Sequence, residues 1–194
     1  PTMAGLKQRE TTIYLAAGCF WGAEQLFRGM PGVTGTCVGY ANGNGVAGVD
    51  EATYESVCAN ETGFHETCRV SFDPARTSLD ALLYAYFRVI DPTLVDRQGN
   101  DRGSQYQAGV FWPADDEATR GEVLRVGTIE RTRTEAKHGA NSFRVRLEAL
   151  RDFYPAEECH QDYLVKNPGG YCHISPAAMR ELQAAPFDPE YYEA

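Results

Sequence analysis

One cysteine of the chain has neighbours that favour a reactive sulfur. Cys19 lies between Gly18 and the aromatic pair Phe20 and Trp21, where a short apolar segment gives way to helical spacing. The first turn of a helix has unpaired amide N–H groups and a positive dipole end, which favour a thiolate. Lowering a thiol pKa from about 8.5 to about 6 takes roughly 3.4 kcal/mol, whereas a helix terminus supplies about 0.5 to 2 kcal/mol. The sequence thus predicts a nucleophile at Cys19 that needs a second helper; a buried structural thiol is the alternative.

The other cysteines and the four histidines show no spacing typical of a metal site. No two cysteines form a C-x-x-C pair, and no histidines form an H-E-x-x-H or H-x-H pair. His65 with Cys68, and Cys159 with His160, could in principle ligate a metal, but polar surface beside small thiols is the simpler interpretation. We expect no metal and no other cofactor.

Composition excludes several classes of protein. The 194 residues are 43% hydrophobic, so we expect one domain over residues 1–194, with a core at about 11–165 and a C-terminal loop and helix at about 166–194. A net charge of −9 repels phosphate backbones, which argues against nucleic-acid binding. The apolar runs are too short to cross a bilayer, and residues 1–10 contain no hydrophobic signal core. We therefore expect a soluble, cytoplasmic protein with reduced thiols.

Alternating strand and helix patterns position these residues. Strands are predicted at residues 11–17, about 37–40, 68–72, 106–112 and 143–147, and helices at about 20–30, 79–90, 115–137 and 176–185. The helix at 79–90 has the clearest amphipathic pattern, with Ser78 as its cap. Residues 41–48, 93–104 and 167–172 are expected to be loops. The fold class is therefore α+β, a two-layer α/β sandwich with a mixed central sheet and a long, loop-rich C-terminal segment.

Further motifs follow one another along most of the chain. They are Gly18–Gly22, Val38–Tyr40, Thr53–Cys58, Thr62–Glu66, Phe72–Pro74, Asp91–Pro92, Arg97–Tyr106, Ala156–Tyr163 and Asn167–Cys172. In this order they resemble the peptide methionine sulfoxide reductase A family, from about residue 11 to 173. The pentapeptide Gly-Cys-Phe-Trp-Gly alone would be moderate evidence, whereas so many motifs in register are highly specific. The resemblance also implies a ferredoxin-like core.

The resemblance implies the main chemical roles. Cys19 is the nucleophile that attacks the sulfoxide sulfur and becomes a sulfenic acid while methionine leaves. Glu66 is the acid, a carboxyl kept protonated in a partly apolar pocket that donates to the sulfoxide oxygen. Tyr54 and Tyr106 are the phenols that hold the same oxygen. Without the resemblance, Glu66 would be interpreted as a solvated surface group and the tyrosines as core packing.

Substrate contacts are implied in the same way. Phe20 and Trp21 hold the methyl group of the sulfoxide, and Asp101 contacts the backbone nitrogen of the substrate or an ordered water. The Asn-Asp-x-Gly setting of Asp101 is explained equally well by a loop turn.

Cys172 is implied as the resolving thiol. The segment Pro168–Gly170 gives its loop the freedom to bring Cys172 within the roughly 4.4 to 6.8 Å between Cα atoms that a disulfide with Cys19 needs. Thioredoxin or a similar dithiol then returns the disulfide to two thiols. Family members often carry another cysteine a few residues further on, and this chain has none after Cys172. The remaining cysteines match no catalytic position and are interpreted as small buried hydrophobes: Cys37, Cys58, Cys68 and Cys159.

As a whole, the resemblance implies an enzyme that reduces the S epimer of methionine sulfoxide, free or in proteins, and so repairs oxidative damage. Its expected partners are methionine sulfoxide and a thioredoxin-like reductant, and we expect a monomer. Two other functions stay open on the sequence. One is a cysteine hydrolase or acyltransferase with His160 as the base for Cys19. The other is a non-enzymatic module that binds methionine-rich peptides through Phe20 and Trp21.

Overall fold

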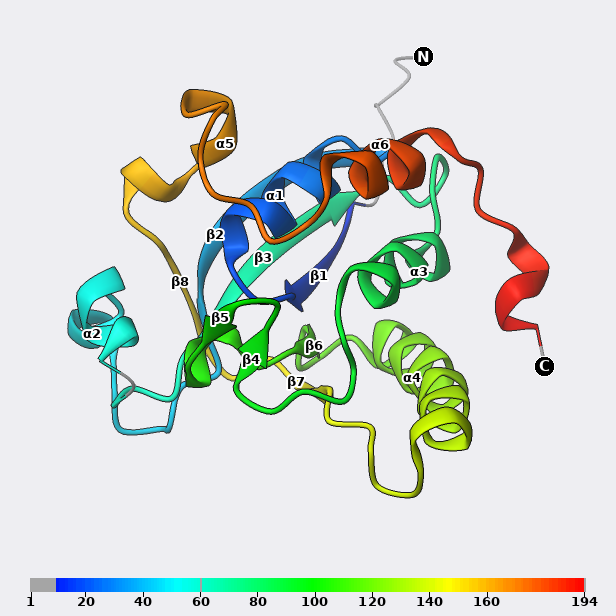
Figure 1. Ribbon diagram of the computed structural model, residues 1–194, viewed down its shortest axis with the longest axis horizontal. Coiled ribbons are helices and arrows are strands. Elements are labelled where there is room, and N and C mark those ends of the chain that lie inside the picture. Colours follow the sequence, from blue (N-terminus) through cyan, green and yellow to red (C-terminus); the bar gives the residue numbers. More distant parts are fainter. Residues whose placement is uncertain (1–9, 60, 194) are drawn as a thin grey trace, which may run out of the picture.

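The computed structural model describes residues 10–59 and 61–193, and one mixed sheet dominates them (Figure 1). Its strand order is β7-β6-β1-β3-β2-β8, with β6 and β7 parallel and the other neighbours antiparallel. The strands are β1 (Thr11–Ala16), β2 (Val33–Ala41), β3 (His65–Phe72), β6 (Gly109–Trp112), β7 (Arg146–Ala149) and β8 (Phe153–Pro155). Two short strands, β4 (Arg97–Gln98) and β5 (Asp101–Arg102), form a separate hairpin.

Helices cover one face of this sheet, and the main core lies between the two layers. The helices are α1 (Phe20–Arg28), α2 (Tyr54–Cys58), α3 (Leu79–Val89), α4 (Glu117–His138), α5 (Tyr163–Lys166) and α6 (Pro176–Ala184). Side chains that alternate along the strands, such as Ile13 and Leu15 of β1, pack in one cluster with apolar residues of α1, α3 and α4. A smaller cluster around Phe111 lies on the opposite face. These layers confirm the predicted α+β sandwich with a mixed sheet, while the ferredoxin-like arrangement of its core stays a prediction.

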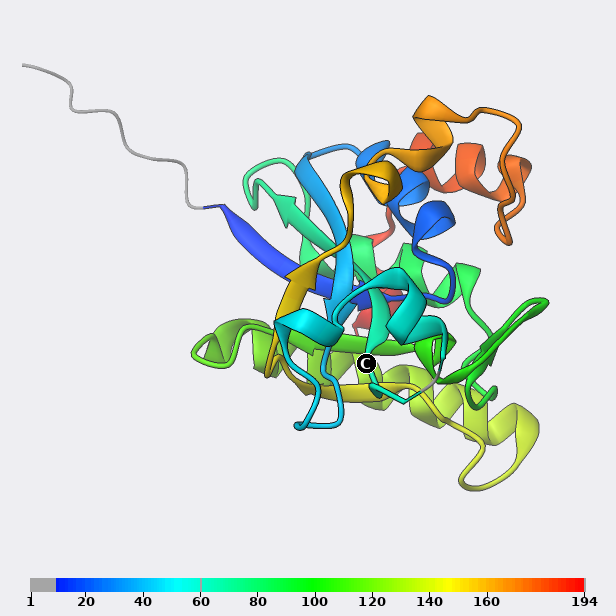
Figure 2. The same ribbon diagram turned by 90° about the vertical axis from the view of Figure 1, so that its left-hand side faces the viewer.

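The C-terminal segment packs on the outer side of α1. In Figure 2 this segment lies on the side of α1 that faces away from the sheet. From α6, the Gln183 side chain donates to the carbonyl oxygens of Gln25 and Leu26 at 3.1 and 2.9 Å, and near α5 the amide of Asp162 donates to Glu24 at 2.8 Å. The helix that follows Cys19 is thus enclosed between the sheet and residues 157–184.

Most long elements were predicted, and most short ones were not. Strand β3 begins at His65 rather than residue 68, which places Glu66 on a central strand. The predicted loop at 93–104 contains the β4-β5 hairpin, and α2, α5 and β8 were missed. These elements have two to five residues, too few for a hydrophobic period to be visible. The opening segment without a signal core lies almost entirely outside the described residues, and no helix within the described ranges meets the length and apolarity of a membrane span.

Candidate active site

Cys19 occupies the sharp turn between the central strand β1 and helix α1. The turn depends on Gly18, whose φ of +80° is a conformation that favours glycine. A side chain at this position would also place its Cβ only 2.7 Å from Cβ of Gln98. Cys19 is the N-cap residue of α1 and is 6% exposed. The backbone amides of Trp21 and Gly22, in the first turn of α1, lower the pKa of its thiol. The sequence prediction of a cysteine at a strand-to-helix turn is therefore confirmed.

A buried carboxyl group lies directly behind this turn. Glu66 on β3 is 1% exposed, and its Oε2 accepts a hydrogen bond from the amide of Phe20 at 3.0 Å. Burial raises the pKa of Glu66 to about 8, the Phe20 amide opposes this shift, and the Asp101 charge adds to it. Glu66 is therefore mostly protonated at neutral pH, and its carboxyl group lies at the backbone amide of Phe20, the residue after Cys19.

The thiol of Cys19 is protonated in the resting protein. Burial raises its pKa far above the ordinary value, and Glu66 in its ionised form and the charge of Asp101 add to this effect, while the amides of Trp21 and Gly22 lower it. The amides at the start of α1 lower the pKa of Cys19 as predicted, but desolvation raises it by more, so the helix start alone does not produce a thiolate. Deprotonation becomes easier when Glu66 is neutral, which couples the two groups.

Two phenols belong to the same group of side chains. Tyr54 opens α2 and Tyr106 ends the short 3-10 turn before β6; burial raises the pKa of both, and a hydrogen bond with the Cys58 side chain adds to the shift of Tyr54. Both phenols therefore stay protonated and can donate hydrogen bonds. Tyr54 is held by its backbone amide, which donates to Glu157 Oε1 at 2.7 Å.

Cys172 reaches this site from the other end of the chain. A Cβ on Gly22, one turn after Cys19, would lie 3.0 Å from the Cys172 sulfur. The thiol donates to the carbonyl of Ile174 at 3.2 Å, and burial raises its pKa. Next to it, the Tyr171 hydroxyl donates to Asp101 on β5 at 3.0 Å, so the Cys172 loop is tied to the hairpin. Both Cys19 and Cys172 are free thiols.

Aromatic rings form a wall beside Cys19. Phe20 is fully buried, with Tyr40 and His160 as ring neighbours at 5.8 and 5.6 Å between centroids. Trp21 is half-buried and stacks on Tyr163 at 3.8 Å between centroids, with 11° between the planes. Its indole N–H donates to His160 Nδ1 at 3.1 Å. Phe20 and Trp21 were both predicted to contact the methyl group of the sulfoxide, and of the two only Trp21 has exposed surface.

Tyr163 was not predicted as a site residue, and His160 was predicted only as the base of the hydrolase alternative, although both belong to the Ala156–Tyr163 motif. The alternative of a cysteine hydrolase needs His160 as a base for Cys19. However, Nδ1 of His160 accepts from Trp21, and Nε2 lies 4.0 Å from the Glu157 carboxylate. The ring is thus occupied in holding the aromatic wall, which argues against that chemistry.

The remaining cysteines differ from the interpretation as buried hydrophobes. Cys68 is fully buried as predicted, while Cys37 and Cys58 are half-buried. Cys159 is exposed, so the prediction is wrong there; it sits in a one-turn 3-10 helix whose next residue, His160, points inward instead. Within the described ranges, no three His, Cys, Asp or Glu side chains gather as a metal site would require.

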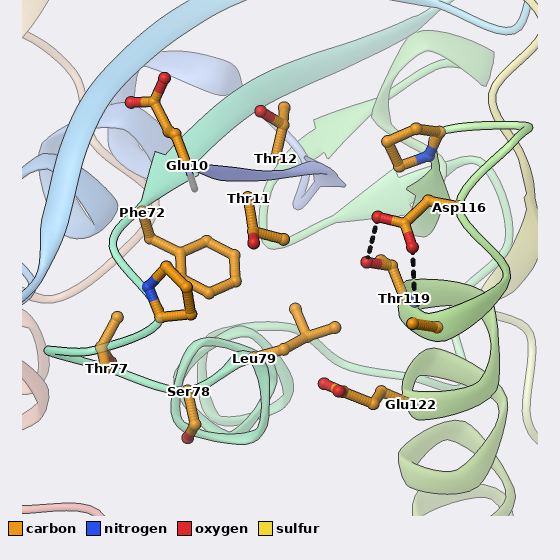
Figure 3. A pocket seen from close by; sticks show the side chains of 13 residues that line it. Glu10, Thr11, Thr12, Phe72, Thr77, Ser78, Leu79, Asp116, Thr119 and Glu122 are labelled. Atoms are coloured by element: carbon orange, nitrogen blue, oxygen red, sulfur yellow. Dashed lines mark hydrogen bonds between the residues drawn. The ribbon is translucent and has the colours of Figure 1, made fainter. Parts of the chain in front are cut away.

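A separate hollow lies near the start of β1, at the opposite end of that strand from Cys19 (Figure 3). It is lined by polar and apolar side chains of β1, α3 and α4, among them Thr11, Leu79 and Glu122. Asp116 points into the region but caps α4, since its carboxylate accepts from the amide and hydroxyl of Thr119 at 3.0 and 2.7 Å. None of the predicted site residues lines this hollow.

Comparisons with known proteins agree with the geometry around Cys19. The family model described as "Peptide methionine sulfoxide reductase" matches residues 11–189. A relative from Lachnoclostridium phytofermentans, "Peptide methionine sulfoxide reductase MsrA", is 45% identical over 174 residues, which cover 90% of this chain and 98% of the relative.

Solved structures give the same result. "Methionine sulfoxide reductase A of Corynebacterium diphtheriae" is 34% identical with a TM-score of 0.75, covering 88% of this chain and 81% of that one. Saccharomyces cerevisiae Mxr1 in reduced form is 33% identical with a TM-score of 0.74, covering 87% and 93%. The complex of Mxr1 with Trx2 is 26% identical with a TM-score of 0.51, covering 84% and 90%.

Proposed function

The chain belongs to the peptide methionine sulfoxide reductase family, and we propose that its site at Cys19 reduces the S epimer of methionine sulfoxide, free or in proteins, to methionine. The observation that carries the assignment of residues is the protonated Glu66 carboxyl, bonded to the amide of Phe20 at 3.0 Å directly behind Cys19. A soft nucleophile beside a buried proton donor is what the removal of a sulfoxide oxygen requires.

In the first step, the sulfur of Cys19 attacks the sulfoxide sulfur. Glu66 donates its proton to the sulfoxide oxygen, and the hydroxyls of Tyr54 and Tyr106 stabilise the charge that develops there. The protonated oxygen then moves to the Cys19 sulfur while the S–O bond of the substrate and the new bond between the two sulfurs break, so methionine leaves and Cys19 becomes a sulfenic acid. The hydrogen of the Cys19 thiol restores the acid at Glu66, so that atoms and electrons balance.

Substrate contacts come from the surrounding wall. Trp21 offers its exposed edge to the methyl group of the sulfoxide, with Phe20 as the buried floor, and His160 and Tyr163 hold the Trp21 ring in place. Asp101, on the hairpin that faces Cys19, takes the backbone nitrogen of the substrate or an ordered water. Burial of the reacting atoms among these rings strengthens each hydrogen bond to the oxygen.

The second step uses Cys172, which attacks the sulfenic acid and forms a disulfide with Cys19. A thioredoxin-like dithiol then reduces this disulfide by exchange at the half-buried Cys172. Support comes from a related yeast protein, Mxr1, whose structure with Trx2 is similar to this chain. The free thiols and this reductant fit a reducing compartment, so we propose a cytoplasmic enzyme that works as a monomeric catalytic domain.

The direct test is an assay that resolves the two sulfoxide epimers. The unaltered protein should convert the S epimer with dithiothreitol as reductant and leave the R epimer intact. Cys19→Ser should lower the rate by at least about a thousandfold, because a hydroxyl cannot replace the soft sulfur nucleophile.

The matched control is Cys159→Ser, because the Cys159 side chain is exposed, unlike that of its neighbour His160, and its replacement should leave the rate unchanged. Conversion of the S epimer by Cys19→Ser at the unaltered rate would assign the chemistry to another residue. Binding of the sulfoxide without release of methionine by the unaltered protein would favour a binding module instead.

A further inference from the structure

His173, the residue after Cys172, has one ring nitrogen in use and one without a partner. Its Nε2 lies 2.8 Å from the carbonyl oxygen of Ala17, at the end of the strand that leads to Cys19. A carbonyl oxygen only accepts hydrogen bonds, so Nε2 carries the hydrogen of the neutral ring and Nδ1 has the lone pair. Burial lowers the pKa of His173, which favours this neutral form.

The Nδ1 atom of His173 is buried and accepts no hydrogen bond. In the part of the chain that the structure describes, Nδ1 of His173 is one of four buried side-chain polar atoms with no hydrogen-bond partner. A buried polar atom left unpaired costs about 1 to 3 kcal/mol, so natural proteins seldom keep one without a use. The charge that acts on the ring from outside its own loop is that of Asp101 on the β4-β5 hairpin, which opposes the lowering of the pKa.

The packing around Gly22 places this nitrogen close to the sulfur of Cys172. A Cβ at Gly22 would lie 3.0 Å from Sγ of Cys172 and 3.3 Å from Nδ1 of His173, so the thiol and the nitrogen pack over the same glycine. Gly22 lies in the first turn of the helix that Cys19 caps, and its backbone amide lowers the pKa of the Cys19 thiol. The Cys172 thiol and the His173 nitrogen therefore lie at the same turn of α1 as Cys19, and the absence of a side chain at Gly22 leaves the room for them.

We propose that Nδ1 of His173 accepts the proton of the Cys172 thiol when Cys172 attacks the sulfenic acid of Cys19. This inference rests on the proposed role of Cys19. The electron pair of the Cys172 sulfur forms the S–S bond, the S–O bond of Cys19 breaks, and the departing hydroxide takes the proton from His173 to leave as water. The Cys19 sulfur is reduced and the Cys172 sulfur is oxidised, so the step balances without another reactant.

A base is needed because the Cys172 thiol does not ionise readily by itself. It is half-buried, burial raises its pKa, and in the resting structure its hydrogen is directed to the carbonyl of Ile174 at 3.2 Å. The thiolate is the attacking species in disulfide formation, so the rate follows the ease of proton removal. The bond from Nε2 to Ala17 holds the ring with Nδ1 at Gly22, which fixes the acceptor before the reaction begins.

The test isolates the disulfide-forming step. Reduced protein with the Cys159→Ser substitution, which removes the exposed thiol that peroxide would oxidise first, is treated with hydrogen peroxide to form the Cys19 sulfenic acid without methionine sulfoxide, and the Cys19–Cys172 bridge is followed by mass spectrometry after rapid quenching. His173→Gln retains an N–H group for the Ala17 carbonyl but has no basic nitrogen. We expect bridge formation to slow by at least about tenfold, the lower end for general base catalysis, and trappable sulfenic acid to accumulate.

A second variant distinguishes a role of His173 in proton transfer from a role in holding the Cys172 loop in place. In His173→Ala, added imidazole should restore part of the rate, because a free base can enter the space of the lost ring. The matched control is His138→Gln, at the exposed end of α4, which should form the bridge at the unaltered rate.

Bridge formation by His173→Gln at the unaltered rate would overturn the proposal. A slow His173→Ala without any response to imidazole would also overturn it and leave His173 as an anchor of the Cys172 loop. Failure of the proposed function has a different signature, since the unaltered protein would then release no methionine from the sulfoxide and yet form the bridge after peroxide.

Discussion

Replacement of Glu66 by Gln should nearly abolish methionine release. The glutamine oxygen can still accept the hydrogen bond from the amide of Phe20, so the turn at Cys19 is preserved. The amide has no acidic proton to give to the sulfoxide oxygen, and a positioned general acid contributes about 10² to 10⁴ in rate. We expect the first turnover of the S epimer at neutral pH to slow by at least about a hundredfold, measured as methionine released per chain after rapid mixing.

The same substitution should stabilise the protein, and increasingly so as the pH rises. The pKa of Glu66 is about 8 in the folded protein, against about 4.5 when the chain is unfolded. Between these values the folded state holds a proton that the unfolded state has lost, so the unfolding free energy of the unaltered protein falls as the pH rises from about 4.5 to about 8. Glutamine is neutral throughout and removes this slope, so the variant should be more stable by a few kcal/mol at pH 8.

Urea unfolding of both proteins at pH 5 and pH 8 measures this difference. The matched control is Glu158→Gln, whose side chain is 90% exposed and which should alter neither rate nor stability. An unchanged rate for Glu66→Gln would remove Glu66 from the chemistry. An advantage in stability that does not grow between pH 5 and pH 8 would mean that the carboxyl is not protonated in the folded protein.

Much of the scaffold was predictable because its long elements carry local signals. Helix α3 spans Leu79–Val89, close to the predicted 79–90, because its apolar stripe and the Ser78 cap are both visible in the sequence. The Ser78 hydroxyl accepts from the amide of Ala81 at 3.1 Å, as a cap does. Helix α4, predicted at about 115–137, and strand β1, predicted at 11–17, also lie close to their predicted bounds.

The ionisation of the site was less predictable, because it depends on burial rather than on sequence neighbours. Glu66 lies among polar residues, which made the strand appear to start at residue 68, and only the pairing of β3 between β1 and β2 shows that the carboxyl is buried. The helix start at Cys19 was visible, but the desolvation of its thiol was not, and desolvation is the larger effect on its pKa.

Contacts between distant residues were also hidden from the sequence. The packing of Cys172 and His173 over Gly22, and the bond from Trp21 to His160, join residues more than 130 positions apart. Only the folded topology brings them together, because the C-terminal segment crosses the outer side of α1. Family motifs supplied the identity of Cys172 but not the reason for its position.

Replacement of Cys172 by Ser should separate the first turnover from all later ones. The Cys19 site is retained, so each chain should still release about one methionine from the S epimer. Turnover with thioredoxin should then fall by at least about a hundredfold, because no disulfide forms that a large protein reductant can attack. Cys19 itself is only 6% exposed, whereas the thiol of Cys172 is half-buried. The measurement is methionine released per chain against time, with thioredoxin, its reductase and NADPH.

A small thiol distinguishes this explanation from damage to the site. Dithiothreitol can reach the Cys19 sulfenic acid directly and should restore a substantial part of the turnover of Cys172→Ser. Cys37 provides the matched control, since it is another half-buried cysteine, on strand β2. Cys37→Ser should keep turnover with thioredoxin; if Cys172→Ser keeps it instead and Cys37→Ser loses it, the resolving thiol is on β2. Since the Cys172 sulfur packs over the first turn of α1 and its neighbour His173 holds an idle base there, we expect the loss to follow Cys172.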